Sequence, residues 1–387
     1  MAISPIAIDA RVLRQIDYLA PHFDLVVTGL GEPPSSVANR PGLRWVEMKL
    51  RYRRLASVIR LPLLFLSRFG SERILEAWYW SSPTHRAAYR NLLAALPTGV
   101  IGVHANDWIT LPMALRLRRE RGARVVLDLH EYAPLEFEER RMWRLIYPRP
   151  ITVLLKRSAR MVDASITVAP TIAERYEREF GLHPVVVLNV PESESLPNHR
   201  PEAARIRLIH HGVAQRQRQL ELAIEAVARA DARFTLDFML IGNPAYVAEL
   251  KARAAARAPN RVHFREPVPP ALVPTTIAAY DLGVFFLPPT GYSKAQALPN
   301  KLFDFMRAGL GVVVGPTPAM AAFVREHQIG TVARSFDPTD LAAALSELSE
   351  AEIEAMRDAS RRTGETFTAA KEMAKVVDLY QGLLAPP

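Results

Sequence analysis

The sequence contains no cysteine among its 387 residues. This absence excludes disulfide bridges, thiolate catalysis, and zinc or iron–sulfur sites ligated by cysteine. Long apolar runs are missing as well: the longest candidate, LPLLFLSRFG, is interrupted by Arg68, so we expect no membrane-spanning helix. The first residues, MAISPIAIDARVL, do not have the basic and apolar regions of a signal peptide. We therefore expect a cytoplasmic protein.

Two further signatures are absent. The sequence has neither a Walker P-loop nor a G-x-G-x-x-G fingerprint, and no D-x-D motif follows a predicted strand. The sequence therefore offers no recognisable phosphate-binding loop and no recognisable metal-binding motif.

Positive charge is concentrated in the first half of the chain. Residues 1–190 carry 27 lysine and arginine side chains against 18 aspartate and glutamate side chains, whereas residues 191–387 carry 22 of each. One half is therefore basic and the other is neutral. This asymmetry predicts an anionic partner for the first half: a membrane phospholipid, a diphosphate-bearing lipid or a nucleic acid.

Apolar runs alternate with helical patterns along most of the chain, which is typical of parallel α/β sheets covered by helices on both faces. We expect strands within residues 24–29, 99–107, 123–131, 163–170, 183–191, 206–212, 234–243, 261–266, 281–289, 311–316 and 330–335. The segment 191–204 is polar, rich in proline and serine and without periodicity, which predicts a linker. The sequence therefore predicts two doubly wound, Rossmann-like domains, in residues 1–190 and 205–367.

The most informative segment of the second domain is 288–316. A predicted strand ends at Pro288, and a loop with glycine, serine and lysine leads into a helix that Pro299 opens. Backbone N–H groups at a helix N-terminus bind phosphate, and Lys301 would add positive charge. The carboxylate of Asp304 would accept hydrogen bonds from a pair of ribose hydroxyls. An ordinary strand–loop–helix unit is the alternative interpretation.

The pattern ALPNKLFDFMRAGL in this segment resembles the retaining glycosyltransferases of family 4, in the branch that builds bacterial surface polysaccharides. The resemblance covers nearly the whole chain and implies the GT-B fold, with two Rossmann-like domains facing across a cleft. That family carries two glutamates eight positions apart, where this chain has Gln296 and Asp304. By resemblance, Asp304 would hold the donor ribose and Gln296 would contact the sugar or the diphosphate. The same donor site would include Pro299, Asn300, Lys301 and Leu302.

A second segment, IRLIHHGVAQRQRQ, places Gly212 at the end of a predicted strand and two arginines before a helix. The absence of a Cβ would let the backbone at Gly212 approach a ligand closely. Arg216 and Arg218 would stabilise a diphosphate leaving group. The resemblance aligns Arg218 with a lysine that grips the diphosphate, and Val213 with an arginine. A solvated turn is the alternative interpretation.

In the first domain, VVLDLHEY places His130 at the end of a predicted strand. The resemblance implies that this histidine touches the donor sugar near the reacting centre. We expect Glu131 and Asp107 to contact the acceptor, although Asp107 suits the role of fixing its loop equally well. The acidic run 136–139 is expected to be a solvated face.

Residues 49–73 combine clustered arginines with leucine, isoleucine and phenylalanine. This mixture favours an interfacial helix on an anionic membrane over a groove for nucleic acid, so we expect no nucleic-acid partner. The cations facing the lipid would be Arg51, Arg53, Arg54, Arg60 and Arg68, and the inserted side chains Leu63, Leu64 and Phe65. A core helix with an arginine-rich solvent edge is the alternative.

The first helical pattern, ARVLRQIDYLA, begins only about eight residues into the sequence. The family has a full central strand and a glycine-rich turn before this helix. Either MAISPIAI supplies a short version of that strand, or the start is truncated.

The resemblance implies a retaining transferase that moves a sugar from a nucleoside-diphosphate sugar to a lipid-linked or glycan acceptor. It also implies that no metal ion and no cofactor take part, and that basic side chains replace a divalent cation as partners of the diphosphate. The product would be a cell-surface polysaccharide or glycolipid. The second domain would bind the donor and the first the acceptor, a helix near 368–387 would pack back on the first domain, and the protein would lie in the cytoplasm or on the inner face of the membrane. Two alternatives remain open: a sugar-nucleotide epimerase of the same fold, and a non-catalytic scaffold in a polysaccharide-assembly complex.

Overall fold

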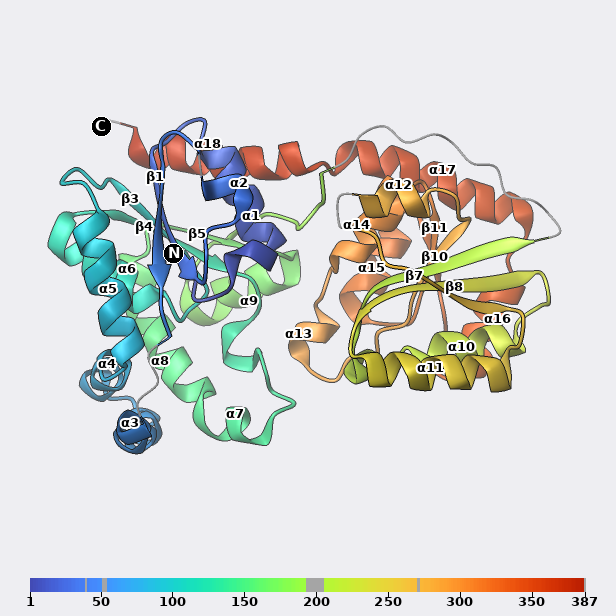
Figure 1. The fold of residues 1–387 in the computed structure, drawn as a ribbon, viewed down its shortest axis with the longest axis horizontal. Coiled ribbons are helices and arrows are strands. Elements are labelled where there is room, and N and C mark those ends of the chain that lie inside the picture. The colour runs from blue at the N-terminus through green and yellow to red at the C-terminus, as the bar shows by residue number, and fades with distance from the viewer. Residues whose placement is uncertain (39, 51–53, 193–204, 270–271, 386–387) are drawn as a thin grey trace. The chain divides into compact units, whose positions relative to one another are not determined.

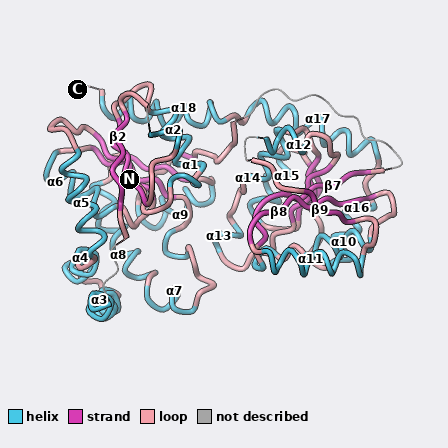
Figure 2. The backbone as a smooth tube through the Cα atoms, in the orientation of Figure 1, coloured by secondary structure: helices cyan, strands magenta, loops and turns pink. Residues whose placement is uncertain are grey.

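The computed structural model describes residues 1–38, 40–50, 54–192, 205–269 and 272–385. The chain divides into two compact units (Figure 1): unit 1 comprises Met1–Leu188 and Glu372–Pro387, and unit 2 comprises Asn189–Lys371. In each unit the strands lie among helices (Figure 2). Almost all of the predicted linker lies outside the described residues. No helix in the described ranges is long and apolar enough to cross a bilayer.

Unit 2 contains a six-stranded, fully parallel sheet in the order β9-β8-β7-β10-β11-β12. Its strands are β7 (Ile206–Ala214), β8 (Phe234–Gly242), β9 (Val262–Arg265), β10 (Leu282–Phe285), β11 (Gly311–Val314) and β12 (Gly330–Val332). This is the doubly wound Rossmann order, in which the chain winds outward in both directions from β7. The switch point, where ligands bind in such sheets, therefore lies between the carboxyl ends of β7 and β10.

Helices cover both faces of this sheet. They are α10 (Glu221–Arg229), α11 (Pro244–Arg257), α12 (Val273–Ile277), α13 (Tyr292–Ala295), α14 (Asn300–Arg307), α15 (Pro318–Glu326), α16 (Pro338–Ser346) and α17 (Glu350–Thr366). Figure 1 shows α10, α11 and α16 on one face, with α12, α14, α15 and α17 on the other. Capping side chains stabilise the N-termini of three of these helices: Asn243 caps α11, Asp337 caps α16, and Ser349 forms a capping box with Glu352 at α17. Because both faces are covered, the strands are apolar along their length, as the sequence predicts.

Unit 1 has two parallel sheets, one of β1 and β2 and the other in the order β3-β4-β5-β6. These strands are β1 (Leu25–Leu30), β2 (Leu43–Met48), β3 (Gly102–Asn106), β4 (Arg124–Leu129), β5 (Ala164–Thr167) and β6 (Val185–Val186). Residues 1–4 link the two sheets, since Ala2 N donates to Thr28 O of β1 and Met1 N to His104 O of β3. Residues 1–4 thus lie between β1 and β3 without forming a regular strand of their own, and Ile6–Ile8 form a short 3-10 helix.

The helices of unit 1 are α1 (Ala10–Leu19), α2 (Ser35–Ala38), α3 (Arg54–Ser67), α4 (Glu72–Trp80), α5 (Pro83–Ala95), α6 (Leu111–Arg121), α7 (Arg141–Ile146), α8 (Pro148–Ser158), α9 (Pro170–Phe180) and α18 (Ala369–Leu384). The last of these shares a core with α1 and the second sheet: Met373, Val376 and Tyr380 pack with Leu19 and Val126. The C-terminal helix therefore belongs, from Glu372 onward, to unit 1.

The predicted α/β class with parallel sheets in two Rossmann-like units is confirmed. The predicted strand within 183–191 is only two residues long, and β2 was not predicted, because LRWVEM has no long apolar run.

The arginine-rich segment differs from the prediction in one respect. Arg51 and Arg53 lie outside the described residues, and the side chain of Arg54 is not described. Leu64, expected to insert into lipid, is instead 3% exposed, because α3 packs this side against α4 and α8. Phe65, Leu66 and Phe69 are exposed.

Candidate functional site

In unit 2, the switch point gathers a lysine, a glycine and a carboxylate. Gly212, near the end of β7, has φ +112°, a conformation that L side chains rarely adopt. A Cβ at this position would lie 2.5 Å from the Nζ atom of Lys301, which projects from the first turn of α14. The glycine is therefore required twice, once for its backbone angle and once for the space that the ammonium group occupies.

Lys301 is buried although its side chain ends in an ionisable amine. Its side chain is almost inaccessible, and its Nζ lies 5.0 Å from the centre of the Phe285 ring. Burial and the nearby guanidinium of Arg218 lower the pKa of Lys301 to about 7, while Asp304 opposes this shift. A buried lysine whose pKa lies so far below its ordinary value makes this position a candidate functional site.

Asp304 lies one turn further along α14, with its Oδ2 atom 3.4 Å from Nε2 of His211. Burial and the charge of Lys301 lower the pKa of His211 to about 3, so this imidazole is neutral at pH 7. The charge of Asp304 is therefore balanced by Lys301 rather than by His211. His210, the preceding residue, points to the other side of the strand, where its Nδ1 lies 2.9 Å from Val284 O.

Other residues predicted for the donor site have different surroundings. Arg218 ends a short 3-10 helix (Arg216–Arg218), and burial lowers its pKa. Arg216 is exposed and forms an ion pair with Glu249, so its charge is already partly balanced. Gln296 ends α13, where its backbone N–H donates to Tyr292 O.

Three further residues of the ALPNKLF pattern were predicted for the donor site, and they lie at the start of α14. Pro299 is the residue preceding the helix, with extended backbone angles, and Asn300 is exposed at the first helical position. Leu302 is 1% exposed, so its side chain belongs to the core. Of the predicted donor residues, the structure thus brings together Gly212, Arg218, Lys301 and Asp304 around one point.

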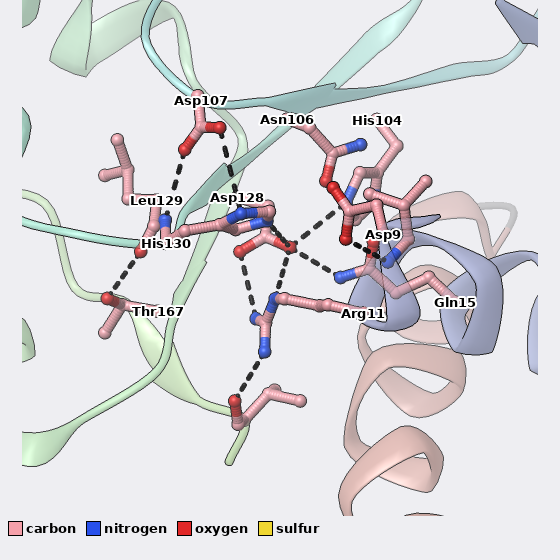
Figure 3. A network of polar contacts seen from close by, with 12 residues as sticks. Asp9, Arg11, Gln15, His104, Asn106, Asp107, Asp128, Leu129, His130 and Thr167 are labelled. Atoms are coloured by element: carbon pink, nitrogen blue, oxygen red, sulfur yellow. Dashed lines mark hydrogen bonds and ion pairs between the residues drawn. The ribbon is translucent and has the colours of Figure 1, made fainter. Parts of the chain in front are cut away.

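In unit 1, the carboxyl ends of β3 and β4 carry a network of polar contacts around Asp128 (Figure 3). Asp128 is fully buried and accepts hydrogen bonds from Arg11 Nε at 3.0 Å and Arg11 Nη2 at 2.9 Å. Gln15 donates to the same carboxylate, and His104 Nε2 lies 3.7 Å from it. Burial alone would raise the pKa of Asp128, but Arg11 and the histidines outweigh it and hold this pKa well below its usual range. We call these residues, with His130 and Asp107, the Asp128 network.

His130 joins this network between two carboxylates. Its Nε2 lies 3.3 Å from Asp128 Oδ2, and its Nδ1 lies 3.7 Å from Asp107 Oδ2. Burial would lower the pKa of His130, but Asp107 and Asp128 together raise it to about 9. At neutral pH His130 is therefore an imidazolium, held at the end of β4 with part of its side chain exposed. Asp107 also fixes its own loop, since its N–H donates to Asp128 O and its O accepts from Thr110 Oγ1.

The acidic run 136–139 was predicted to be a solvated face, and this prediction is wrong for Glu136. Its side chain is half-buried and accepts a hydrogen bond from Trp108 Nε1 at 3.4 Å. Burial and the charges of Asp107 and Glu131 raise the pKa of Glu136 to about 8. Glu131 is exposed, and its carbonyl oxygen accepts from Tyr176. No cluster of three or more histidine, aspartate or glutamate residues suited to a metal ion occurs in the described part of the chain.

The sequence analysis did not single out Arg11, Asp128 or His211 as site residues. An isolated aspartate inside an otherwise apolar strand was a usable signal for Asp128, because a buried carboxylate requires a partner. Its partner Arg11 is 117 residues away in sequence and gave no such signal.

Comparisons with known proteins show a family match for part of the chain and a common fold for nearly all of it. Residues 205–351 match the family described as glycosyl transferases group 1. The comparison with curated proteins gave no match. Among solved structures, sucrose-phosphate synthase from Thermosynechococcus elongatus superposes with a TM-score of 0.72 at 14% identity, over 97% of this chain and 93% of that one. HepE from Anabaena, in complex with UDP, superposes with a TM-score of 0.66 at 14% identity, over 96% of this chain and 95% of that one.

The fold is GT-B. A third structure, WaaG, a glycosyltransferase involved in lipopolysaccharide biosynthesis, has a TM-score of 0.60 at 14% identity, over 99% of this chain and 97% of that one. These superpositions over nearly the whole chain establish the GT-B fold of two Rossmann-like units. The match to group 1 glycosyl transferases covers most of unit 2, which holds the Lys301 site.

Proposed function

We propose that this GT-B protein is a retaining, metal-independent glycosyltransferase of the family 4 type. It would transfer a sugar from a nucleoside-diphosphate sugar to a lipid-linked or glycan acceptor, in the synthesis of a cell-surface polysaccharide or glycolipid. Unit 2 would bind the donor and unit 1 the acceptor. The match of residues 205–351 to group 1 glycosyl transferases and the UDP complex of the GT-B protein HepE support this proposal.

The observation that carries the donor assignment is the buried ammonium group of Lys301 beside Gly212, at the switch point of unit 2. A diphosphate at this place would meet Lys301, Arg218 and the N-terminal N–H groups of α14. Asp304, one turn into the helix, would accept hydrogen bonds from the ribose hydroxyls. The two cations would thus bind the diphosphate group of the nucleotide, and the carboxylate would bind its ribose.

The same groups suit the proposed chemistry. As the glycosidic bond breaks, the diphosphate gains negative charge, and fixed cations stabilise this charge more than that of the intact donor. In a front-face displacement, the leaving diphosphate oxygen would accept the proton of the incoming hydroxyl, and the new bond would form on the same face of the sugar. His130, charged at neutral pH, would orient a sugar or acceptor hydroxyl by donating a hydrogen bond.

A second candidate, a sugar-nucleotide epimerase, is favoured by one observation. Asp107, His130 and Glu136 form a cluster whose pKa values are all raised, to about 9 for His130 and about 8 for Glu136, as groups in acid–base catalysis often are. An epimerase would convert a nucleotide sugar without any acceptor.

A panel of nucleoside diphosphates and nucleotide sugars separates these functions. We expect one nucleotide diphosphate to raise the melting temperature, and nucleotide release to require both its sugar donor and an acceptor. Turnover without acceptor would indicate the epimerase. Absence of any thermal response to the whole panel would instead indicate a non-catalytic scaffold.

We further propose that unit 1 binds the inner face of the cell membrane through α3 and the residues after it. Phe65 and Phe69 are 43% and 72% exposed, and the guanidinium of Arg68 lies 5.0 Å from the Phe65 ring. Exposed aromatic side chains beside a cation are typical of interfacial helices on anionic lipid. Arg60 is less available, because its guanidinium lies over the Trp78 ring.

Co-sedimentation with anionic and neutral vesicles tests this surface. Moving one exposed phenylalanine side chain from water into an apolar environment is favourable by about 1.5–3 kcal/mol. We therefore expect the Phe65→Ser/Phe69→Ser variant to bind anionic vesicles at least about tenfold more weakly. Ile241→Ser, which changes an equally exposed apolar side chain in unit 2, is the matched control. Equal binding of both variants would exclude this surface as the membrane contact.

A further inference from the structure

His211 is a buried polar side chain of unit 2 to which the proposed function gives no role. It lies on β7, one residue before Gly212, and is 6% exposed. Its Nε2 atom is buried, forms no hydrogen bond of ordinary geometry, and lies 3.4 Å from Oδ2 of Asp304. Buried polar atoms in folded proteins nearly always have a partner. A buried nitrogen so close to a carboxylate therefore requires an explanation.

Core packing fixes the imidazole ring of His211. The ring of Phe305, which follows Asp304 on α14, meets it edge to face, with 5.4 Å between the ring centres and 87° between the ring planes. Phe305 is itself fully buried and packs over Gly283 of β10, where a Cβ would lie 2.3 Å from the phenylalanine ring. Residues of β7, β10 and α14 thus hold the imidazole beside the carboxylate. In an interior packed this closely, the ring has few other orientations.

The protonation state of His211 determines what it offers to Asp304. Burial and the charge of Lys301 lower the pKa of His211 to about 3, so the ring is neutral at pH 7 and carries one proton. If that proton were on Nδ1, a lone pair of Nε2 would face a carboxylate oxygen, which is unfavourable. The proton therefore belongs on Nε2, where the N–H group is directed to the carboxylate. A neutral donor orients a carboxylate without cancelling its charge, whereas a cation would cancel it.

We propose that His211 is a positioning residue, which holds the carboxylate of Asp304 in the orientation that accepts both hydroxyls of the donor ribose. This inference rests on the proposed function, in which Asp304 binds that ribose. A carboxylate offers about four acceptor directions, so one contact with His211 leaves enough of them for two hydroxyls. A carboxylate that is already oriented in the free protein also loses less conformational freedom when the ribose binds. His211 would therefore contribute to the preference for ribose over 2′-deoxyribose.

Two simpler roles for His211 lead to different expectations. If the imidazole only fills the core, a phenylalanine at this position should leave nucleotide affinity unchanged, because it has a similar shape and keeps the contact with Phe305. If the Nε2–H group instead contacts the diphosphate, its loss should weaken the binding of pyrophosphate as much as that of a nucleotide. A positioning role predicts a loss that is confined to ligands with a ribose.

The test measures dissociation constants of the full chain for UDP, GDP, ADP and CDP, for their 2′-deoxy forms and for inorganic pyrophosphate. For the nucleotide that binds the wild type most tightly, we expect His211→Phe to weaken binding by about tenfold and to remove most of the preference for ribose. The affinity for pyrophosphate should not change. His211→Gln returns an N–H donor near the place of Nε2 and should restore much of the lost affinity. His263→Phe, which changes a half-buried histidine of β9 in the same sheet, is the matched control.

A double variant and NMR spectra test the contact itself. Because a positioning residue acts through its partner, His211→Phe combined with Asp304→Ala should bind the nucleotide no more weakly than Asp304→Ala alone. Long-range ¹H–¹⁵N spectra of the free wild-type protein should show His211 protonated at Nε2.

Several outcomes would overturn the inference. They are an unchanged ribose preference in His211→Phe, an equal loss of affinity for pyrophosphate, additive effects in the double variant, and a proton on Nδ1. If none of the four diphosphates binds the wild-type protein, the inference and the proposed function fail together. A failure of the inference alone leaves nucleotide binding by the wild type intact, so the two results are distinguishable.

Discussion

The affinity for a nucleoside diphosphate should fall steeply as the pH rises above 7, because Lys301 must be protonated to hold the diphosphate. In the free protein, burial and Arg218 lower the pKa of Lys301 to about 7, so about half of the molecules carry a neutral amine at neutral pH. A bound diphosphate would bring negative charge next to the amine and raise this pKa toward its ordinary value. Binding would therefore be coupled to proton uptake.

The size of the effect follows from the free pKa. If the bound form stays protonated up to pH 9, the dissociation constant rises with the fraction of neutral lysine in the free protein. This gives a weakening of about fivefold between pH 7 and pH 8 and of about tenfold between pH 8 and pH 9. The secondary phosphate group, with a pKa near 6, is ionised over this range and does not contribute. At pH 8, binding should take up about 0.9 protons per site.

Isothermal titration calorimetry in buffers of different ionisation enthalpy measures both quantities. Lys301→Arg keeps a permanent charge and should bind with little dependence on pH, whereas Lys301→Met should bind weakly at every pH. Lys251→Met, which removes an exposed lysine on α11, is the control and should keep the wild-type slope. A wild-type affinity that is constant from pH 7 to pH 9 would refute the buried-lysine argument. So would a Lys301→Met variant with the same slope.

Three other substitutions test the donor site proposed in unit 2 and the Asp128 network of unit 1. Asp304→Ala should weaken nucleotide binding by about 1.5–3 kcal/mol, through the loss of charged hydrogen bonds to the ribose, and an unchanged dissociation constant for the nucleotide would contradict this assignment. Arg218→Ala should lower kcat more than donor affinity, because the charge of the diphosphate grows toward the transition state; a loss confined to affinity would assign Arg218 to binding alone. Asp128→Asn should destabilise unit 1 by about 3–5 kcal/mol, since it leaves the buried Arg11 without its counter-charge. In the same variant the NMR titration of His130 should show a pKa below the value of about 9, and an unchanged titration would assign that shift to Asp107 alone.

The fold was largely predictable because its signals are local. A strand such as GVVV, which helices cover on both faces, is an uninterrupted apolar run in the sequence. The residues that begin and end a helix lie next to that helix in the sequence. The element that escaped prediction, β2, has an ordinary mixed sequence, and its pairing with β1 is a tertiary property. The same holds for α3, where the burial of Leu64 and the exposure of Phe65 depend on which neighbours the helix packs against.

The residues around Lys301 were predictable for a different reason. Gly212 and the ALPNKLF pattern each occupy the end of a strand or the start of a helix, and in a doubly wound sheet these ends converge at the switch point. What the sequence did not give is the contact between them: that the Lys301 ammonium lies where a Cβ of residue 212 would be, and that His211 is neutral beside Asp304. Both depend on burial, which no local pattern encodes.

The Asp128 network shows the limit most clearly, since Arg11 and Gln15 of α1 lie 117 and 113 residues from their partner Asp128 in the sequence. His130 at the end of a strand suggested a functional imidazole, but nothing near it indicated its charge. That charge follows from geometry: one fully buried carboxylate and a second one at 3.7 Å outweigh the cost of burying the ring. Arg11, from the first helix, in turn keeps Asp128 ionised. The protonation state of a residue at the proposed reacting centre is therefore set by a helix that contributes no group to the chemistry, and a substitution in α1 at Arg11 should change the pH dependence of the reaction without touching the substrate.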